Sequence, residues 1–391
     1  MKHLITKLSV KQAMREVKSF EWEGDYKPSA QAAIKDLLEK RMVGYVDEYL
    51  SNIKDEEIED RRNGSYERHL LTEIGDIVLE VSRTRRISAQ NIVKAFARRS
   101  MSVDRMILSC FTLGLSSRKV SMALLPALGE KISPSTVSKV SKQLDSAVES
   151  YHKRPLRDKY RFLFFDGVVL KNKTGSGSVK KCVLVALGIT FDGKKEVIDF
   201  KLSHSESQQS WESFLNDLYN RGLCGEKTKL IVVDGGTGLR AGLEMVYPHI
   251  KQQSCWAHKN RNVLKHVRKI DHDIVKTDLK KISHAGSIKE AKRMYKHFVT
   301  KWEKDYPKSV RCLQKDIENL LAFFSIPDAN LWNEIRTTNA IERRSEEVRR
   351  RTRPMGVFAD KTSMERILYA IFTYENFRQG TATPFLMTHK N

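Results

Sequence analysis

The chain has 391 residues, too many for one small hydrophobic core, so two or three domains are expected. Its 70 Lys and Arg against 48 Asp and Glu give a formal net charge of +22, which points to a polyanionic partner, most commonly a nucleic acid. No apolar run is long enough for a membrane span, and no signal-peptide pattern opens the sequence. The five scattered cysteines argue against a disulfide framework. We therefore expect a cytoplasmic, nucleoid-associated protein without a membrane partner.

The first part of the chain predicts a helix followed by a small β-unit. Residues 28–60 look helical. Residues 63–85 read as a small β-unit with turns at Asn63-Gly64 and Gly75-Asp76, in which Ile77, Leu79 and Val81 alternate with polar residues. Residues 83–103 then carry several basic side chains and no acid. We therefore assign residues 1–100 to a DNA-binding and oligomerisation region.

From residue 103 to residue 150 the apolar spacing becomes helical. Gly114 ends one helix, a second helix follows, and Ser133 then provides an N-cap with Pro134 as the first residue of a third. Because that last helix is small, polar and basic, residues 101–155 resemble a helix–turn–helix DNA-binding region, with an ordinary helical hairpin as the alternative. The side chains expected to face DNA are Ser135, Thr136, Lys139 and Lys142.

An α/β pattern occupies residues 160–260. The expected strands are 161–170, 179–190, 195–203 and 228–234, and the expected amphipathic helix is 207–222. Three consecutive strands, a helix and a fourth strand predict a mixed sheet with helices packed on it. Asp192-Gly193 reads as a plain hairpin turn within this pattern. Beyond it, residues 262–335 are mostly helical and polar, and helices resume at 339–353 and 362–378.

Two other Asp-Gly pairs follow apolar runs. Asp166 ends "RFLFFD" and Asp234 ends "KLIVVD". A turn explains each pair locally, but a helical crossover between the two strands can make them neighbours in one sheet, with their carboxylates side by side. Glu342, in "TTNAIERR", is a third candidate acid; with Asn339 as N-cap it would instead close a capping box.

Three clustered carboxylates repel one another unless a cation lies between them. Carboxylate oxygens suit Mg²⁺ or Mn²⁺, and two such ions can activate a nucleophile and stabilise a leaving oxygen in phosphoryl transfer. The acids therefore favour metal-assisted chemistry on a nucleic-acid backbone.

From about residue 60 to residue 378 the sequence resembles the Mutator-type family of bacterial insertion-sequence transposases. The resemblance is carried, in order, by "SPSTVSKV", "FFDGVVLK", "ALGITFDGKKEVIDF" with "SESQQSWESFLNDLYNRGL", "VVDGGTGLRAGLEMVYP", "CWAHKNRN" and "TTNAIERRSEEVRRRTRPMGVF". It implies a DDE recombinase with an α/β, RNase H-like catalytic domain and an α-helical insertion, preceded by a mainly α-helical DNA-binding region. The implied catalytic and metal-binding triad is Asp166, Asp234 and Glu342, with two Mg²⁺ ions for which Mn²⁺ can substitute. The catalytic core then comprises 156–261 and 336–391, around an insertion at 262–335.

The same resemblance places a Cys-x-x-His element on Cys255 and His258. A zinc half-site is the alternative, but no second Cys/His pair has zinc-like spacing, so we prefer a packed cysteine and a histidine that supports the site or faces a phosphate. Other residues expected at the DNA backbone are Lys259, Arg261, Arg349, Arg350, Arg351 and Arg353. Trp332 resembles aromatics that related transposases stack on DNA bases, with a core tryptophan as the alternative. Ser345 departs from the family, which commonly has Asn three residues after the Glu.

We therefore expect a divalent-metal-dependent DNA transposase that cleaves phosphodiesters at the element's terminal inverted repeats and transfers the freed 3′-hydroxyl to target DNA. Joining two ends suggests a homodimer or a larger assembly on DNA. The alternatives are a non-catalytic, sequence-specific DNA-binding regulator and an RNase H-like nuclease without strand transfer.

Overall fold

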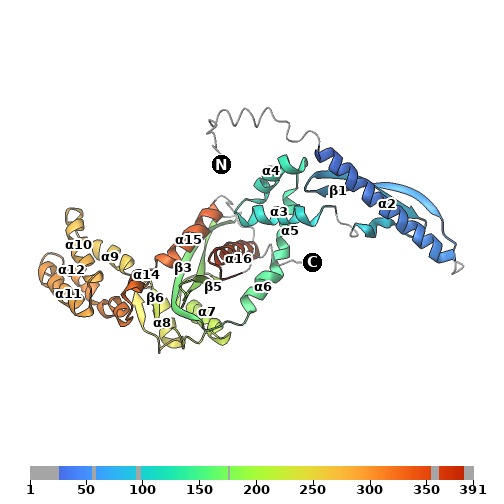
Figure 1. The fold of residues 1–391 in the computed structure, drawn as a ribbon. Coiled ribbons are helices and arrows are strands. Elements are labelled where there is room, and N and C mark those ends of the chain that lie inside the picture. The colour runs from blue at the N-terminus through green and yellow to red at the C-terminus, as the bar shows by residue number, and fades with distance from the viewer. Residues whose placement is uncertain (1–25, 55–58, 94–97, 175–176, 354–360, 383–391) are drawn as a thin grey trace, which may run out of the picture. The chain divides into compact units, whose positions relative to one another are not determined.

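The computed structural model describes residues 26–54, 59–93, 98–174, 177–353 and 361–382 (Figure 1). The chain divides into two compact units. The first comprises Met1–Phe111 and Ser117–Val140, and the second comprises Thr112–Ser116 and Ser141–Asn391. This division falls inside the segment that we assigned to the helix–turn–helix region.

In the first unit, helix α2 (Tyr26–Lys54) packs on an antiparallel hairpin of β1 (Arg62–Thr72) and β2 (Gly75–Thr84). The small core of this hairpin includes Met42, Val46, Leu79 and Val81, and the short helix η1 (Ala89–Ile92) also contacts it. Gly75 has a φ of +113°, which permits the tight connection between the strands. The predicted β-unit and its turn at Gly75-Asp76 are confirmed, but Asn63-Gly64 is not a turn, because both residues lie within β1 at a register shift. Residues 59–60, expected in the preceding helix, lie outside it.

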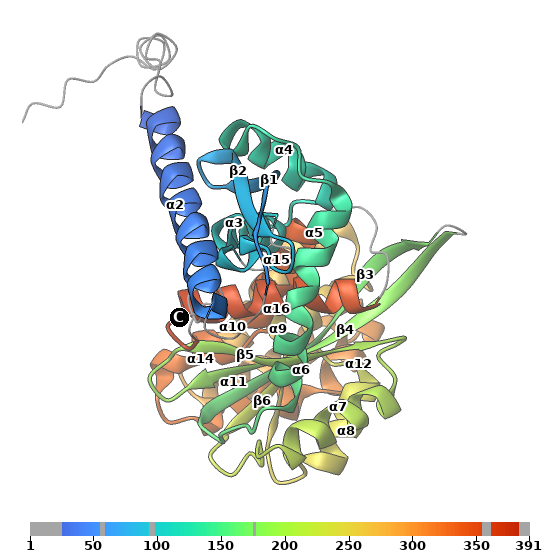
Figure 2. The ribbon, with the colours of Figure 1, turned by 90° about the vertical axis from the view of Figure 1, so that its right-hand side faces the viewer.

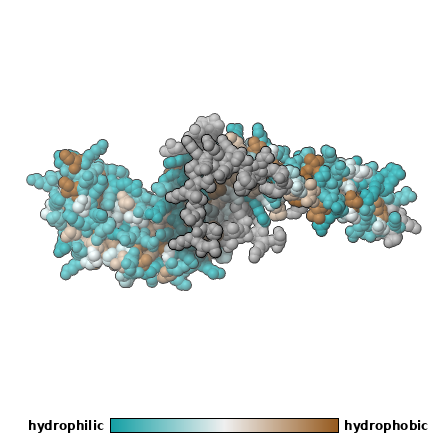
Figure 3. All heavy atoms as spheres, turned by 45° about the horizontal axis from the view of Figure 1, so that its top comes forward, coloured by the Kyte–Doolittle hydropathy of each residue, from teal (hydrophilic) through white to brown (hydrophobic). Residues whose placement is uncertain are grey.

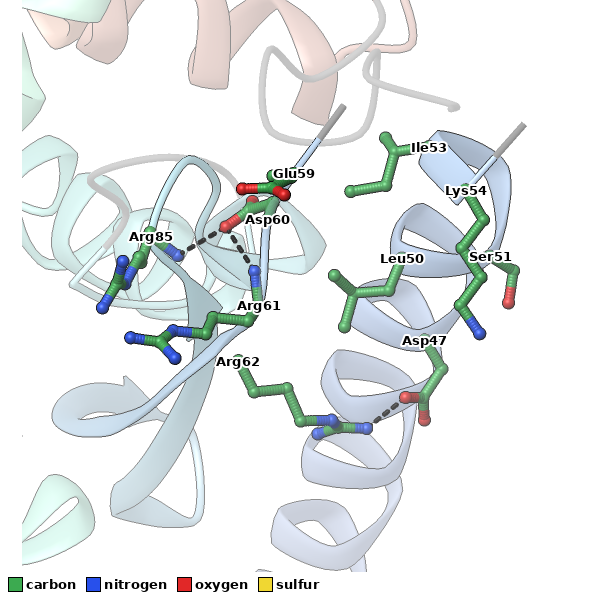
Figure 4. Close-up of a pocket in the computed structure, with 10 residues that line it drawn as sticks. All are labelled: Asp47, Leu50, Ser51, Ile53, Lys54, Glu59, Asp60, Arg61, Arg62 and Arg85. Atoms are coloured by element: carbon green, nitrogen blue, oxygen red, sulfur yellow. Dashed lines mark hydrogen bonds and ion pairs between the residues drawn. The ribbon is translucent and has the colours of Figure 1, made fainter. Parts of the chain in front are cut away.

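A hollow lies between the C-terminal part of α2 and the start of β1, and it is lined mostly by charged residues (Figure 4). Arg62 pairs with Asp47, and the backbone N–H groups of Arg61 and Arg85 donate to Oδ1 of Asp60 at 2.7 Å and 3.1 Å. Asp47 and Asp60 in this hollow are thus already paired with an arginine side chain and with backbone N–H groups of the protein.

The predicted run of short helices forms as α3 (Met101–Thr112), α4 (Ser117–Leu128) and α5 (Pro134–Ser141), followed by η2 (Lys142–Leu144) and α6 (Asp145–Lys153). The turn after α3 uses Gly114, whose φ is +94°. The N-cap prediction is confirmed, because Oγ of Ser133 accepts the backbone N–H of Thr136 at 3.1 Å. Val137 and Val140 are buried on one face of α5.

The second unit is built on a mixed sheet, as predicted, with five strands where four were expected. Its strands are β3 (Tyr160–Thr174), β4 (Gly177–Thr190), β5 (Lys195–Ser203), β6 (Leu230–Val233) and β7 (Gln252–Ser254), in the spatial order β5-β4-β3-β6-β7. Strands β3, β4 and β5 are antiparallel, whereas β6 is parallel to β3 and β7 is parallel to β6. The short, polar β7 was not expected from the sequence.

Helices cover both faces of this sheet (Figure 2). On one face, α7 (Gln208–Asn220) and α8 (Thr237–Val246) bury Trp211 and Leu243 against Leu163 and Phe165 of β3. On the other face lie α6, α15 (Asn339–Thr352) and α16 (Lys361–Arg378), where rings such as Phe372 contact β5. Successive residues of a strand therefore point into different layers.

The helical segment expected at 262–335 lies beside β7 and starts earlier than expected, at Trp256. It comprises α9 (Trp256–Leu264), η3 (Lys269–Asp271), α10 (His272–Ser283), α11 (Ile288–Trp302), α12 (Pro307–Gln314), α13 (Ile317–Leu320), η4 (Ala322–Ser325), η5 (Ala329–Leu331) and α14 (Trp332–Ile335). The buried amide of Gln253 joins the two parts: it donates to the carbonyl of Leu320 at 3.1 Å and accepts from the N–H of Phe323 at 2.7 Å. This segment thereby covers the edge of the sheet.

Trp332 packs within that segment. Its ring meets Phe323 and Phe324 edge-on, with centroids 5.6 Å and 4.9 Å away, and its Nε1–H donates to the carbonyl of Ile326 at 2.9 Å. These contacts favour the core interpretation of Trp332 over base stacking.

The surface is mainly hydrophilic on the face seen in Figure 3, and apolar residues appear as scattered spots. The most exposed isoleucines include Ile270 and Ile274, at 84% and 51% exposure. Scattered apolar residues of this kind are normal on protein surfaces. Among the residues that the structure describes, no helix combines the length and apolar composition that a membrane span requires.

Candidate active site

Asp166 lies inside β3 and is not in a hairpin turn. It pairs with Val185 of β4, so the strand continues through Asp166-Gly167. Asp192-Gly193, by contrast, is a turn as predicted, because Gly193 has a φ of +80° and its N–H donates to the carbonyl of Thr190 at 3.1 Å. Asp166-Gly167 is therefore part of a strand, whereas Asp192-Gly193 forms a turn.

The parallel register brings Asp166 and Asp234 together. Phe165 of β3 is opposite Val233 of β6, and an aspartate follows each of them. Phe165 and Val233 are both buried with α7 and α8. Because side chains alternate along strands, the next positions face the layer that contains α15.

Glycines shape the loop after Asp234. Gly235 has a φ of +103°, and the N–H of Gly236 donates to Oδ1 of Asp234 at 3.0 Å before α8 begins. Gly238 lies so close to the preceding crossover that a Cβ there would be 2.7 Å from the carbonyl oxygen of Glu206. The glycine-rich sequence therefore has a structural cause: it turns the chain sharply and lets α8 approach α7.

Glu342 lies in the first turn of α15, and the alternative interpretation, in which Asn339 is the N-cap and Glu342 closes a capping box, is wrong. The N-cap is Thr338, and Asn339 is already helical. Oγ1 of Thr338 donates to Oε1 of Glu342 at 2.9 Å. The glutamate side chain therefore binds a hydroxyl one turn earlier and does not cap the backbone of Asn339.

Helix α15 also contacts Asp166 directly. Ser345, one turn after Glu342, is 3% exposed, and its Oγ donates to Oδ2 of Asp166 at 3.3 Å. Residues three apart share a helix face. The helix face that carries Glu342 is therefore the one that packs on β3 at Asp166.

The aspartates form a strongly negative site. Burial raises the pKa of Asp166 to about 7, and the charge of Asp234 acts in the same direction, while the hydrogen bond from Ser345 opposes the shift. Carboxylate oxygens crowded in this way match the donor chemistry of Mg²⁺ and Mn²⁺. The residues present thus fit a hard divalent cation.

The carboxylate of Glu342 lies with Cys255 and His258. The ligand atoms of these three residues are all within 4.8 Å of one another, whereas the three acids Asp166, Asp234 and Glu342 form no such group in this conformation. Nδ1 of His258 is 3.5 Å from Oε1 of Glu342. The triad expected from the resemblance is thus brought to one end of the sheet, but Glu342 does not join the two aspartates directly.

Main-chain contacts hold Cys255 and His258 in place. The N–H of Cys255 donates to the carbonyl of Val233 at 2.8 Å, and Cys255 is the N-cap of α9, whose first turn carries His258. Thr338 donates its backbone N–H to Sγ of Cys255 at 3.3 Å, and its Oγ1 lies 3.2 Å from the same sulfur. Burial acts to raise the pKa of the Cys255 thiol, but the hydrogen bonds from His258 and Thr338 bring it below its usual value. The hydrogen bond with Cys255 in turn raises the pKa of His258.

Two residues near the site were not anticipated from the sequence. Thr338 is fully buried and connects Cys255 with Glu342. Glu206 lies against Gly167, where an added Cβ would come within 2.4 Å of its Oε1, and its charge also raises the pKa of Asp166. Neither has a local sequence signal, because Glu206 only precedes a helix cap and Thr338 is one of two adjacent threonines.

The residues expected at DNA differ in exposure. The exposed ones are Ser135, Lys139, Lys142, Arg261, Arg349, Arg350 and Arg353, and Thr136 and His258 are half-buried. Lys259 is only 9% exposed and binds Asp316 and the carbonyl of Cys312. Arg351 is 7% exposed and binds Glu347 and the carbonyl of Thr112. This corrects the expectation for Lys259 and Arg351, because internal acceptors already satisfy both cations.

A family model described as "Transposase, Mutator family" matches residues 1–380. The chain is similar to the transposase for insertion sequence element IS905 of Lactococcus lactis subsp. lactis (strain IL1403), with 30% identity over 356 residues that cover 91% of this chain and 90% of that relative. It is 31% identical over 343 residues to the transposase for IS1201 of Lactobacillus helveticus, covering 86% and 91% of the two chains. It is 30% identical over 332 residues to the transposase for IS256 in transposon Tn4001 of Staphylococcus aureus, covering 83% and 84%.

Proposed function

Because this chain belongs to the Mutator family of transposases, we propose that it cleaves DNA at the ends of its own insertion sequence and transfers the freed 3′-hydroxyls to target DNA. The proposal assigns catalysis to Asp166, Asp234 and Glu342 in a DDE-type, RNase H-like core formed by the second unit. It assigns recognition of the terminal repeats to the helix pair α4 and α5, used as a helix–turn–helix. Two ends are joined in one reaction, so the working form is a homodimer or larger assembly on chromosomal DNA.

One observation carries the catalytic assignment. Asp166 and Asp234 follow paired residues of parallel strands, and the helix bearing Glu342 packs on Asp166 through Ser345. The family shares a DNA-cleaving and DNA-transferring activity, and these residues bring acidic side chains to one end of its sheet. An ordinary structural role would not require two neighbouring carboxylates, since their mutual repulsion costs stability.

The proposed residues have distinct tasks. Asp166 and Asp234 would hold divalent ions, and Glu342 would complete the site by rotating away from Thr338. Two Mg²⁺ ions, or Mn²⁺ in their place, would activate the attacking oxygen and stabilise the leaving oxygen of the phosphodiester. The exposed guanidinium of Arg261, 3.5 Å from Glu342, is suited to hold the phosphate backbone beside the acids.

The test is donor-end cleavage and joining by purified full-length protein with Mg²⁺. We expect Asp166→Asn, Asp234→Asn and Glu342→Gln each to reduce nicking by at least about a hundredfold while binding of end DNA persists. Asp192→Asn is the matched control, because it changes an Asp-Gly pair that only forms a turn, and it should leave nicking unchanged.

The same assay separates the alternatives. Nicking that persists in all three acid variants would exclude the proposed catalytic residues. End-specific binding without any nicking, and without dependence on divalent metal, would identify a DNA-binding regulator. Nicking without joining to target DNA would identify a nuclease.

A further inference from the structure

We propose that Cys255, His258 and Glu342 form a second metal site, one that binds Zn²⁺ or a similar borderline transition ion. The ligand atoms of the three residues lie within 4.8 Å of one another. Among the described residues they are the one group of three or more His, Cys, Asp or Glu side chains gathered this closely. Glu342 supplies the third ligand that the Cys-x-x-His spacing alone lacks.

The donor set distinguishes this site from the pair of aspartates. A thiolate, an imidazole and a carboxylate match Zn²⁺, whereas Mg²⁺ prefers oxygen ligands only. Three protein ligands, with water in the fourth position, are the arrangement of catalytic zinc sites, whereas structural sites use four protein ligands. Cys255 is 1% exposed, and the side chains of His258 and Glu342 are 28% and 31% exposed, so an ion can enter from the side of the histidine and the glutamate.

The scaffold around the three ligands is already fixed. The N–H of Trp256 donates to the carbonyl of Arg336 at 3.0 Å, which ties the start of α9 to the segment before α15. Thr338 then contacts all three ligands: its Oγ1 is 3.2 Å from Sγ of Cys255, 3.4 Å from Nδ1 of His258 and 2.9 Å from Oε1 of Glu342. The ligands therefore need only a small closure, in which the ion replaces the Thr338 hydroxyl as their common partner and the thiol releases its proton to water.

Occupation of this site has a consequence for catalysis, and this part rests on the proposed function. The carboxylate of Glu342 cannot bind Zn²⁺ beside Cys255 and also complete the site at Asp166 and Asp234. Zn²⁺ would therefore inhibit Mg²⁺-dependent cleavage by holding Glu342 in the conformation seen in this structure. The inhibition is reversible, because removal of the ion returns the glutamate to Thr338.

Binding is measured first, without any assay of activity. Full-length protein freed of metal is titrated with Co²⁺, whose sulfur-to-metal charge-transfer band reports a bound thiolate, and with Zn²⁺ in competition with a chromophoric chelator. We expect a thiolate band that corresponds to one Co²⁺ bound at Cys255 and that Zn²⁺ abolishes. Cys255→Ser should remove the band, and His258→Gln and Glu342→Gln should each weaken Zn²⁺ binding at least about tenfold. Cys224→Ser is the matched control and should keep both the Co²⁺ thiolate band and the wild-type affinity for Zn²⁺.

A second readout covers the case in which the buried Cys255 variant folds poorly. Zn²⁺ should raise the unfolding temperature of the wild type, since a ligand bound only by the folded state stabilises it, and this increase should be lost in Glu342→Gln. Unchanged Zn²⁺ affinity in Glu342→Gln, or a thiolate band that survives Cys255→Ser, would overturn the site.

Cleavage separates this inference from the proposed function. Zn²⁺ binding that requires Glu342, in a protein that never nicks DNA, would refute the function and leave the metal site standing. Mg²⁺-dependent nicking that Zn²⁺ leaves unaffected at saturating occupancy would refute the inhibition and leave the function standing.

Discussion

The Oγ of Ser345 donates a hydrogen bond to Oδ2 of Asp166 at 3.3 Å, which links the face of α15 that carries Glu342 to the strand that carries the aspartate. The hydrogen bond lowers the pKa of Asp166, against the effects of burial and of Asp234. Asparagine, the residue that the family resemblance leads us to expect at this position, also has a donor. The substitution therefore keeps a hydrogen-bond donor beside the acid.

Replacing Ser345 by alanine should weaken the candidate active site without unfolding it. The loss of one hydrogen bond to a charged group costs about 1.5 kcal/mol, so Mg²⁺-dependent nicking should fall about tenfold. Ser345→Asn should retain more of the activity than Ser345→Ala because its amide still donates. Ser325→Ala, which removes an exposed hydroxyl bound only to the carbonyl of Ala322, is the control. Equal activity of the alanine variant and the wild type would show that this contact is dispensable.

The raised pKa of Asp166 predicts a pH-dependent loss of stability. In the unfolded chain this carboxyl loses its proton near 3.8, whereas in the folded protein it keeps the proton up to about 7. Between these values the folded state binds more protons, so the free energy of unfolding falls as the pH rises. Asp166→Asn has no carboxyl to deprotonate, so its free energy of unfolding does not fall in this way. We expect it to unfold at least about 2 °C above the wild type at pH 8, which is the shift that about 1 kcal/mol produces in a unit of this size.

This difference between Asp166→Asn and the wild type should shrink below pH 5, where the wild-type carboxyl is protonated, and also on addition of Mg²⁺, which compensates the charge. Asp192→Asn is the control, because hydrogen bonds from Thr190 and Lys194 lower the pKa of Asp192, opposite to the shift at Asp166. This variant should therefore not be more stable than the wild type at pH 8. Thermal unfolding followed by circular dichroism measures all three proteins. A wild type that is more stable than Asp166→Asn at pH 8 without metal would contradict the prediction.

Exposed and buried cations should behave differently toward DNA. Arg353 is exposed, so Arg353→Gln should reduce the slope of log affinity against log salt for random duplex DNA by about 1. Lys259 is buried against Asp316, so Lys259→Gln should leave the slope unchanged and lower the free energy of unfolding by about 3 kcal/mol. A change in the salt slope with Lys259→Gln would mean that this lysine leaves Asp316 on binding DNA.

Helix α5 gives a prediction about specificity. Lys139 is exposed on this helix, so Lys139→Gln should weaken binding to the element's terminal DNA about tenfold and affect random duplex DNA much less. Lys131, exposed in the preceding turn, supplies the control variant Lys131→Gln. Electrophoretic mobility shift with both DNAs measures the ratio. Equal losses on the two DNAs would limit Lys139 to backbone contact.

Local pattern was sufficient for most of the fold. The alternation and length of the apolar runs identified the first four strands of the sheet, and the Ser133-Pro134 pair located the start of α5. The apolar runs before Asp166 and Asp234, with a crossover helix between them, also predicted that these acids would be neighbours. These features are set by residues close in the chain, where periodicity and capping act. The short β7 has too few residues for a periodic signal and was missed.

The sequence by itself therefore determined the family, the mixed sheet and the pairing of Asp166 with Asp234. Only the tertiary structure decided that Glu342 lies with Cys255 and His258 around Thr338 and that Ser345 contacts Asp166. It also decided that Lys259 is buried in an ion pair with Asp316. The physical reason is that these contacts join different elements: α15 meets α9 and β3, and α9 meets the residue that precedes α13. Their geometry depends on how whole helices pack, which the spacing of residues within any one segment does not encode.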